Sequence, residues 1–287
     1  MAVTPRPAHD ETIIFLHLPK TAGSTLGAIV KRQYPPEAVY LRYAGPGVGP
    51  FQEILALPEP QRARLRLLMG HLPFGIHETL PRPARYVTIL REPVERVVSH
   101  YYFVRRRPDH HLHETVTSRR MTLRDFVESG IARELENGQT TWMGWSPELI
   151  ARDDRSSPEL LVRATRNLED RFVVAGLTER FDETLLVMRE RLGWTRSIWY
   201  RQENVTRNRP ALAEIDEDTR ALIVERNGLD IELYRYVRDR FEREISDLGP
   251  AFGRELRSFR IRNAGYARIP PAVFAVRRKM AAAVRGR

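Results

Sequence analysis

The sequence predicts a single α/β domain in which helices flank a central parallel sheet. Short apolar, β-branched runs alternate with segments of helical periodicity, as they do in βαβ units. Several of these runs end in polar or basic turns, which is typical of the ligand-binding edge of such sheets. The chain has 287 residues, 42% of them hydrophobic, which is enough to bury one sizeable core.

Residues 13–16 form the first expected strand, and a helical pattern begins at Ser24. The connecting loop contains proline, glycine and several hydroxyl side chains. A strand, a tight loop and a helix N-terminus together direct backbone N–H groups and the helix dipole toward one point. The loop is therefore predicted to hold a phosphate-like anion through Lys20, Thr21, Ala22, Gly23, Ser24 and Thr25.

Lys20 stands out because the chain has three lysines among 47 basic residues. A compact ammonium suits a single bridging or terminal oxygen, whereas a guanidinium prefers a bidentate partner. The Walker motif of nucleotide triphosphatases needs its lysine directly after the second glycine. Here Lys20 precedes Gly23 and no GxxxxGK occurs, so ATP or GTP hydrolysis is disfavoured.

A second apolar run over residues 65–70 predicts another strand, and His71 follows it in a Gly-His-Leu-Pro-Phe-Gly turn. Residues at strand ends and on loops frequently carry the chemistry of α/β folds. A base near neutral pH is most often a histidine. His71 is therefore the preferred candidate for a general base, a group that would take a proton from a bound substrate.

A third run, residues 86–90, is a buried-type strand that ends at Arg91. Pro93 suits the first turn of the helix that follows. Apolar residues at i, i+3, i+4 and i+7 then give that helix one core-facing stripe, and Ser99 falls off it.

The loop His-Leu-Pro-Lys-Thr-Ala-Gly-Ser-Thr-Leu and the Arg91–Ser99 segment resemble the carbohydrate sulfotransferases that use 3′-phosphoadenosine 5′-phosphosulfate (PAPS), especially the 2-O-sulfotransferase-like group, sulfotransferase family 2 type. The resemblance covers most of residues 12–208. It implies a P-loop-like sulfotransferase domain and in-line transfer of a sulfuryl group to a carbohydrate hydroxyl. It also implies that residues 20–25 hold the 5′-phosphosulfate and that Arg91 and Ser99 hold the 3′-phosphate.

The same resemblance implies that Lys20 stabilises the leaving phosphate and that His71 deprotonates the acceptor, with no metal required. Gly-His-x-x-Phe is similar to the family segment that carries a catalytic histidine. Some members have another histidine where this chain has Met69. His77 and Glu78 therefore remain alternative bases.

Other segments are less specific. The 137–142 segment resembles a family loop that borders the nucleotide or acceptor, and 171–177 reads as a further strand. The helix expected through Phe181–Leu192 has Asp182 as its candidate cap. Asn204 and Arg207 are weak candidates in a polar loop that closes over the nucleotide in relatives.

The remaining histidines have simpler interpretations. His17 is expected to pack or bond to backbone, and His100 to be structural. His110, His111 and His113 lack a second ligand group at zinc-like spacing and follow three arginines, Arg105–Arg107. A solvated or acceptor-binding loop is expected there, and its arginines favour an anionic acceptor.

The basic charge is concentrated at the C-terminus. We divide the chain into an extension (1–10), the domain (11–250) and a basic tail (251–287) that has ten basic residues and one acidic residue. An amphipathic basic helix is expected over 272–284, suited to an anionic membrane surface or an acidic glycan, with a solvated or docked helix as the alternative. Nucleic-acid binding is not expected.

Cysteine is absent, no apolar run reaches membrane-spanning length, and the N-terminus has no signal-like apolar stretch. We therefore expect a cytoplasmic protein, with peripheral contact at the inner membrane surface. Two other classes stay open. One is a nucleotide-dependent kinase or NTPase of related fold, and the other is a non-catalytic glycan- or membrane-binding relative that uses the basic tail.

Overall fold

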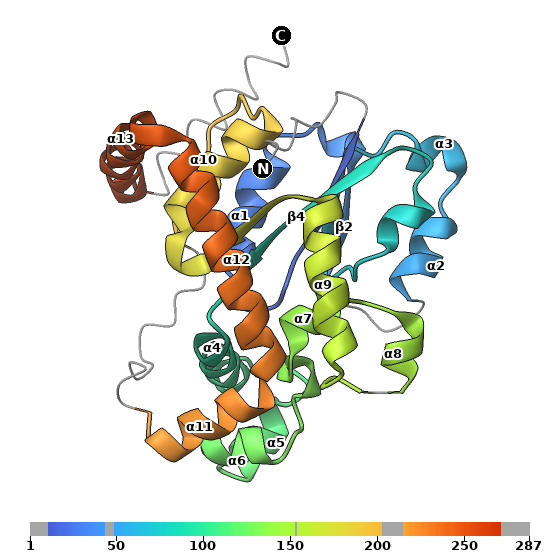
Figure 1. Ribbon diagram of the computed structural model, residues 1–287, viewed down its shortest axis with the longest axis vertical. Coiled ribbons are helices and arrows are strands. Elements are labelled where there is room, and N and C mark those ends of the chain that lie inside the picture. Colours follow the sequence, from blue (N-terminus) through green and yellow to red (C-terminus); the bar gives the residue numbers. More distant parts are fainter. Residues whose placement is uncertain (1–10, 44–48, 153, 203–214, 271–287) are drawn as a thin grey trace.

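A five-stranded parallel sheet forms the centre of the molecule, which confirms the predicted fold class (Figure 1). The computed structural model describes residues 11–43, 49–152, 154–202 and 215–270. The extension 1–10, Asn204, Arg207 and the expected helix over 272–284 lie outside these ranges. The strands are β1 Thr12–Leu16, β2 Val39–Arg42, β3 Leu67–Gly70, β4 Ala84–Leu90 and β5 Phe172–Leu177.

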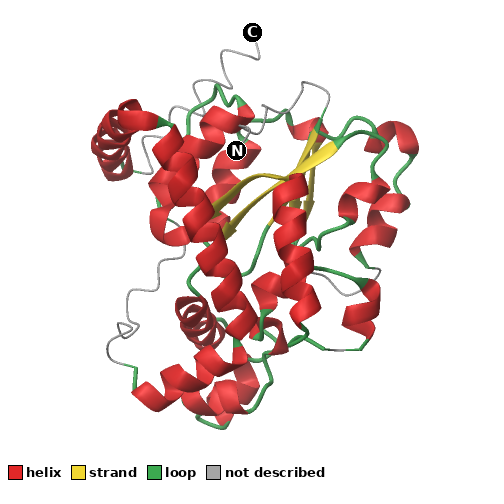
Figure 2. Ribbon diagram, viewed as in Figure 1, coloured by secondary structure: helices red, strands yellow, loops and turns green. Residues whose placement is uncertain are grey.

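Helices enclose the strands (Figure 2). The helices on which the later sections draw most are α1 Gly23–Lys31, α4 Pro93–Arg106, α9 Pro158–Arg171, α10 Phe181–Leu192, α12 Gly228–Asp247 and α13 Gly249–Arg268. The other helices are α2 Pro50–Leu55, α3 Glu59–Arg62, α5 His113–Ser118, α6 Leu123–Glu128, α7 Gly138–Met143, α8 Pro147–Ala151 and α11 Glu217–Arg226. The 3₁₀ turns are η1 Pro36–Ala38, η2 Ile76–Thr79, η3 Arg133–Leu135 and η4 Thr178–Arg180.

The strand order β2-β3-β1-β4-β5 places β1 in the middle, between β3 and β4. Ile13 pairs with Leu67 on one side, and Phe15 pairs with Val87 on the other. The chain leaves β1 toward β2 and leaves β4 toward β5, so the loops after β1 and β4 diverge. Open α/β sheets bind ligands at such a switch point, outside the carboxyl ends of the strands.

The core explains why these runs become strands. β1, β3 and β5 are buried along their whole length, as parallel strands covered on both faces should be. Helices α9, α10 and α12 contact β5, and a second apolar cluster forms beneath α4 around Val97, Val98 and Phe126. The same near-continuous apolar composition made these strands predictable.

Two local features differ from expectation. β2 was not predicted, because it is an edge strand of four residues that stay partly or largely exposed, too short to show a strand pattern. The prediction that Asp182 caps its helix is wrong: Arg180 occupies the N-cap position of α10. Asp182 instead accepts a hydrogen bond from Tyr200 at 2.7 Å.

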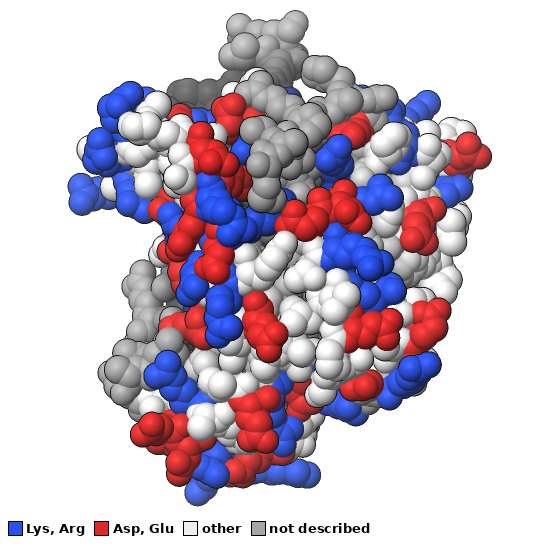
Figure 3. Space-filling view, in the orientation of Figure 1, with Lys and Arg blue, Asp and Glu red and all other residues white. Residues whose placement is uncertain are grey.

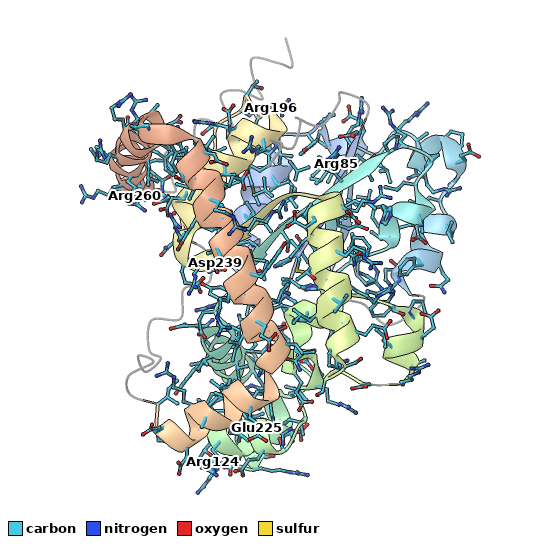
Figure 4. The ribbon with its side chains drawn as sticks, viewed as in Figure 1. Arg85, Arg124, Arg196, Glu225, Asp239 and Arg260 are labelled. Atoms are coloured by element: carbon cyan, nitrogen blue, oxygen red, sulfur yellow. The ribbon has the colours of Figure 1, made fainter. Side chains whose placement is uncertain are left out.

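Helix α13 carries the first part of the basic tail. It packs through Phe252 and Phe259, and Phe259 stacks on Trp199 at 5.0 Å between ring centroids. Arg260, labelled on α13 in Figure 4, pairs with Asp182 of α10 at 3.3 Å. Within the described ranges no helix is both long and apolar enough to cross a membrane. The face drawn in Figure 3 intersperses acidic and basic side chains.

Candidate active site

The loop between β1 and α1 is shaped to receive an anion. Lys20 and Ala22 both have left-handed backbone conformations, with φ of 71° and 60°. Such conformations cost about 1–3 kcal/mol for residues other than glycine, so the surrounding structure must impose them. The Thr21 hydroxyl donates to the Leu18 carbonyl at 2.8 Å and closes the turn.

Helix α1 begins directly after this turn. Its N-cap, Ala22, provides no side-chain cap, and its first turn contains no acidic residue. Neither a capping oxygen nor a carboxylate therefore competes for the positive end of the helix dipole. Ser24 is exposed at this end, whereas Thr25 is buried. The arrangement fits the phosphosulfate of the predicted donor.

Position 23 requires glycine because the His17 ring occupies the space that a side chain would fill. A Cβ atom at Gly23 would lie 1.5 Å from His17 Nε2, so the imidazole rests directly on the start of α1. His17 is 8% exposed, and burial lowers its pKa to about 3, assisted by His71 and Lys20. The ring is neutral at pH 7. As expected, His17 is a packing residue of the loop.

His71 lies at the carboxyl end of β3, beside this loop. Its Nδ1 is 2.9 Å from the carbonyl oxygen of His17, and since a carbonyl accepts, Nδ1 must carry the proton. Nε2 then holds the lone pair. Burial lowers the pKa of His71, the His17 carbonyl opposes this, and Arg42 adds to it. His71 is therefore neutral at pH 7 with Nε2 able to accept a proton.

Aromatic rings surround the candidate base. The His17 ring stacks on His71 with centroids 4.9 Å apart, Tyr43 meets it edge-on at 5.8 Å, and Trp142 lies at 6.3 Å. Tyr43 is 45% exposed. Met69, where some relatives have histidine, is fully buried, and its methyl group packs close to Gly27 of α1.

Arg91 follows β4 and reaches back to the anion loop. Its Nη1 donates to the Lys20 carbonyl at 3.1 Å, and its Nη2 pairs with Glu95 at 2.9 Å. Ser99 lies one turn beyond Glu95 on α4 and is 7% exposed. The structure thus brings Lys20 and Arg91 together at one sheet edge, and it places Ser99 on the helix that follows Arg91.

The Lys20 side chain lies in a cationic environment. Its Nζ is 3.9 Å from the centroid of the Phe103 ring, which lies one turn beyond Ser99 on α4. Burial, and after it the charges of Arg91, Arg106 and Arg107 in that order, lower the pKa of Lys20 to about 8. A bound anion would relieve this repulsion.

Two of the other histidines, His100 and His110, lie near Lys20, whereas His77 lies elsewhere. The ring centroids of His100 and His110 are 5.5 Å apart, and His111 stacks on His110. Burial lowers the pKa of His100 to about 3. Among the described residues no group of three or more histidine, aspartate or glutamate side chains is arranged to hold a metal ion.

His77, by contrast, lies beside the beginnings of β4 and β5. Its Nδ1 is 2.9 Å from the Tyr86 hydroxyl, and burial and nearby Arg171 lower its pKa. Tyr86 also stacks on Phe172, the first residue of β5. The structure does not bring His77 next to Lys20, and Glu78 is exposed. This placement favours His71 over both alternatives.

Sequence reasoning missed two residues that shape this site. Phe103, which supports the Lys20 ammonium, reads from sequence as one more apolar helix residue. Gln139 lies in the 137–142 segment that resembles a nucleotide-bordering loop, but nothing in the sequence indicates its partner. It exchanges two hydrogen bonds with the backbone of Arg91, each 2.9 Å.

An α/β fold with an anion loop, a basic strand end and a histidine at one switch point is typical of proteins that bind a phosphate-bearing ligand. Comparison with known families narrows this class. The sequence model of a family described as galactose-3-O-sulfotransferase matches residues 2–270. The chain therefore belongs to this family, which confirms the predicted membership of a carbohydrate sulfotransferase family. The match does not confirm the finer 2-O-sulfotransferase-like, family 2 assignment.

Individual curated relatives of this chain have names consistent with the family match. Galactose-3-O-sulfotransferase 3 of Bos taurus and of Homo sapiens are each 28% identical over 278 residues, or 90% of this chain. Galactosylceramide sulfotransferase of Mus musculus is 26% identical over 87% of the chain. The chain spans 64%, 63% and 60% of the length of these three relatives. Mouse sulfotransferase SULT7A1, solved in complex with PAP, matches with a TM-score of 0.37 and 16% identity, covering 77% of this chain and 65% of that one.

Proposed function

We propose that this protein is a PAPS-dependent sulfotransferase that transfers a sulfuryl group to a hydroxyl of a galactose-containing glycan or glycolipid. The observation that carries the proposal is the convergence of Lys20, His71 and Arg91 at the carboxyl ends of β1, β3 and β4. Membership of the galactose-3-O-sulfotransferase family supports it.

The donor supplies a sulfuryl group bonded to a phosphate that leaves. Negative charge grows on the bridging oxygen during transfer, and the Lys20 ammonium and the N–H groups at the start of α1 would stabilise it. Arg91 and Ser99 would bind the 3′-phosphate, since the Arg91 side chain already lies against the loop at Lys20. By analogy with phosphoryl transfer, positioning and charge stabilisation supply most of the rate.

The acceptor hydroxyl must lose a proton as it attacks the sulfur. His71 Nε2 would take it, because the His17 carbonyl holds the proton of the ring on Nδ1. The resulting imidazolium is stabilised by the same carbonyl. Tyr43 and Trp142, which flank the ring, would border the sugar.

We place the transfer on the 3-hydroxyl of galactose. The family match spans residues 2–270, whereas the likeness to 2-O-sulfotransferases is specific only at the two segments predicted to bind the donor, which both classes use. Arg106 and Arg107 add positive charge near Lys20, which supports an acceptor that carries an anionic group of its own.

The test is transfer of labelled sulfate from PAPS to three acceptors: a galactose-terminated oligosaccharide, galactosylceramide and a uronic-acid polymer. We expect product with the galactose acceptors. Lys20→Ala should lower kcat by about 10²- to 10³-fold, as removal of one charge-stabilising group does. The matched control is Lys31→Ala, at the exposed end of α1, which should retain activity. Product with the uronic-acid polymer alone would overturn the galactose assignment.

We further propose peripheral contact with an anionic membrane through α13. Arg254, Arg257 and Arg262 are exposed on this helix, and Ile261 is 75% exposed beside them. Arg257→Glu combined with Arg262→Glu should reduce sedimentation with vesicles containing anionic lipid. Arg220→Glu is the control, since α11 and α13 lie at opposite ends of α12 (Figure 1). Equal loss in control and test variants would contradict a contact through α13.

A further inference from the structure

A buried polar network lies behind the candidate site and reaches both of its phosphate-binding segments. Its nearest member is Gln139, which is fully buried on α7. Its Oε1 accepts from the Arg91 backbone N–H, and its Nε2 donates to the Arg91 carbonyl, both at 2.9 Å. One side chain thus fixes both sides of the residue at which β4 ends.

Gln139 is itself held by a residue 91 positions later in the chain. Asp230 on α12 accepts hydrogen bonds from the backbone N–H of Gln139 at 3.1 Å and of Thr140 at 2.7 Å. It also accepts from the Thr140 hydroxyl at 2.8 Å. Asp230 therefore performs for α7 the function of an N-cap side chain, from another helix.

Arg96 connects this carboxylate to the anion loop. Its guanidinium is fully buried and lies 3.6 Å from Asp230. Its Nε donates to the Pro19 carbonyl at 3.2 Å, and its Nη2 donates to the Glu134 carbonyl at 3.1 Å. Gly138 leaves room for it, since a Cβ there would lie 2.8 Å from Nη2.

We propose that Gln139, together with the Arg96–Asp230 pair, positions Arg91 relative to the anion loop so that both phosphates of the nucleotide are held at once. This inference rests on the proposed function. The two phosphates of the nucleotide are joined covalently, so their receptors must keep a matching separation. Gln139 fixes one receptor, Arg96 contacts the carbonyl before Lys20 in the other, and Asp230 joins them.

The hydrogen bonds of this network also make it rigid enough to position Arg91. Arg96, Asp230 and Gln139 all have hydrogen-bond partners, and a satisfied buried network is rigid. Removing one charge of a buried pair destabilises the fold strongly. Gln139 is neutral, so its substitution tests positioning with the least risk to folding.

The experiment compares the binding of adenosine 3′,5′-bisphosphate (PAP) and 5′-AMP, which lacks the 3′-phosphate, by calorimetry. Gln139→Met keeps the length of the side chain and removes both hydrogen bonds to Arg91. We expect affinity for PAP to fall by about 10- to 100-fold, as small misplacements of a binding group do, with 5′-AMP changed less than about twofold. In an Arg91→Met background, Gln139→Met should cause no further loss of affinity for PAP, because the Arg91 guanidinium that Gln139 positions is already absent.

The matched control is Arg191→Met. It breaks the 2.7 Å ion pair with Glu244 that joins α10 to α12, away from the loop. It should lower the unfolding midpoint while leaving the PAP-to-AMP affinity ratio unchanged. If Gln139→Met does not fold, Gln139→Glu, which retains the acceptor for the Arg91 N–H, undergoes the same titrations.

The two proposals fail differently. A wild-type protein that does not prefer PAP over 5′-AMP overturns the proposed function. If the wild-type protein prefers PAP, two results overturn the positioning role of Gln139. One is that the Gln139 variant keeps this preference, and the other is that Arg191→Met loses it to the same extent. Additive losses in the Gln139–Arg91 double variant also overturn it, because the two residues would then act independently.

Discussion

The protonation state of His71 follows from a single backbone contact. The His17 carbonyl can only accept, so the neutral ring carries its proton on Nδ1 and presents Nε2. The position of His71 after an apolar run was predictable from sequence. Its tautomer was not, because the acceptor lies 54 residues earlier and depends on the pairing of β1 with β3.

The pH dependence of kcat/KM should have two limbs. Transfer needs neutral His71, whose pKa lies below its ordinary 6.5, so activity should persist down to a pH below that value. Transfer also needs protonated Lys20, whose pKa is about 8, so activity should fall as the pH rises through that region. Lys20→Arg should abolish the alkaline limb. An acidic limb above pH 6.5 would contradict the assignment of His71.

His71 and His77 can be separated by substitution. His71→Ala should lower kcat by about 10²- to 10⁴-fold, the usual contribution of a general base. His77→Ala loses its contact with the Tyr86 hydroxyl, so it should lower stability and leave kcat within severalfold of wild type. Steady-state kinetics beside thermal unfolding distinguishes the two, and the reverse pattern would make His77 the base.

At the scale of elements, the β1–α1 unit shows why one glycine cannot be replaced. Gly23 was predicted as part of an anion loop, where glycine lets a ligand approach the backbone. The structure gives another reason, since the His17 ring occupies the space of its missing side chain. The strand, the loop and the helix start could be inferred locally, but this contact depends on how the loop folds back.

Gly23→Ala should therefore disturb two functions together. The added methyl group would displace His17, and with it the carbonyl that orients His71 and the loop that carries Lys20. We expect a loss of about 1–3 kcal/mol in stability, typical of overpacking, and lower affinity for PAP. The control is Gly265→Ala, in α13, where nothing lies within 4 Å of the added atom. An active, wild-type-like Gly23→Ala would contradict this account.

At the scale of the whole molecule, the site depends on segments distant in sequence. The apolar runs predicted β1, β3, β4 and β5, and the sheet edge then brought three predicted residues together. Asp230 could not be predicted, because an acidic residue in an amphipathic helix ordinarily faces solvent. β2 also gave no signal, because an edge strand of four residues is too short to show a strand pattern.

Buried histidines should make the fold sensitive to acid. Burial lowers the pKa of His17 and of His100 to about 3, so between pH 6.5 and 3 the unfolded chain binds more protons than the folded one. The free energy of unfolding should then fall by about 1.4 kcal/mol per pH unit for each histidine as the pH decreases. Urea unfolding from pH 7 to 4 measures this slope. His100→Gln should reduce it, and a slope unaffected by that change would contradict a buried neutral His100.

The central claim is that one sheet edge holds both phosphates of a PAPS-type nucleotide. Calorimetric titration of PAP into wild type, Lys20→Ala and Arg91→Ala, with ATP as the comparison ligand, tests it most directly. We expect wild type to bind PAP in strong preference to ATP. Arg91→Ala should lose most of that preference because the 3′-phosphate loses its guanidinium partner. Absence of PAP binding, or stronger binding of ATP with magnesium, would contradict the sulfotransferase assignment.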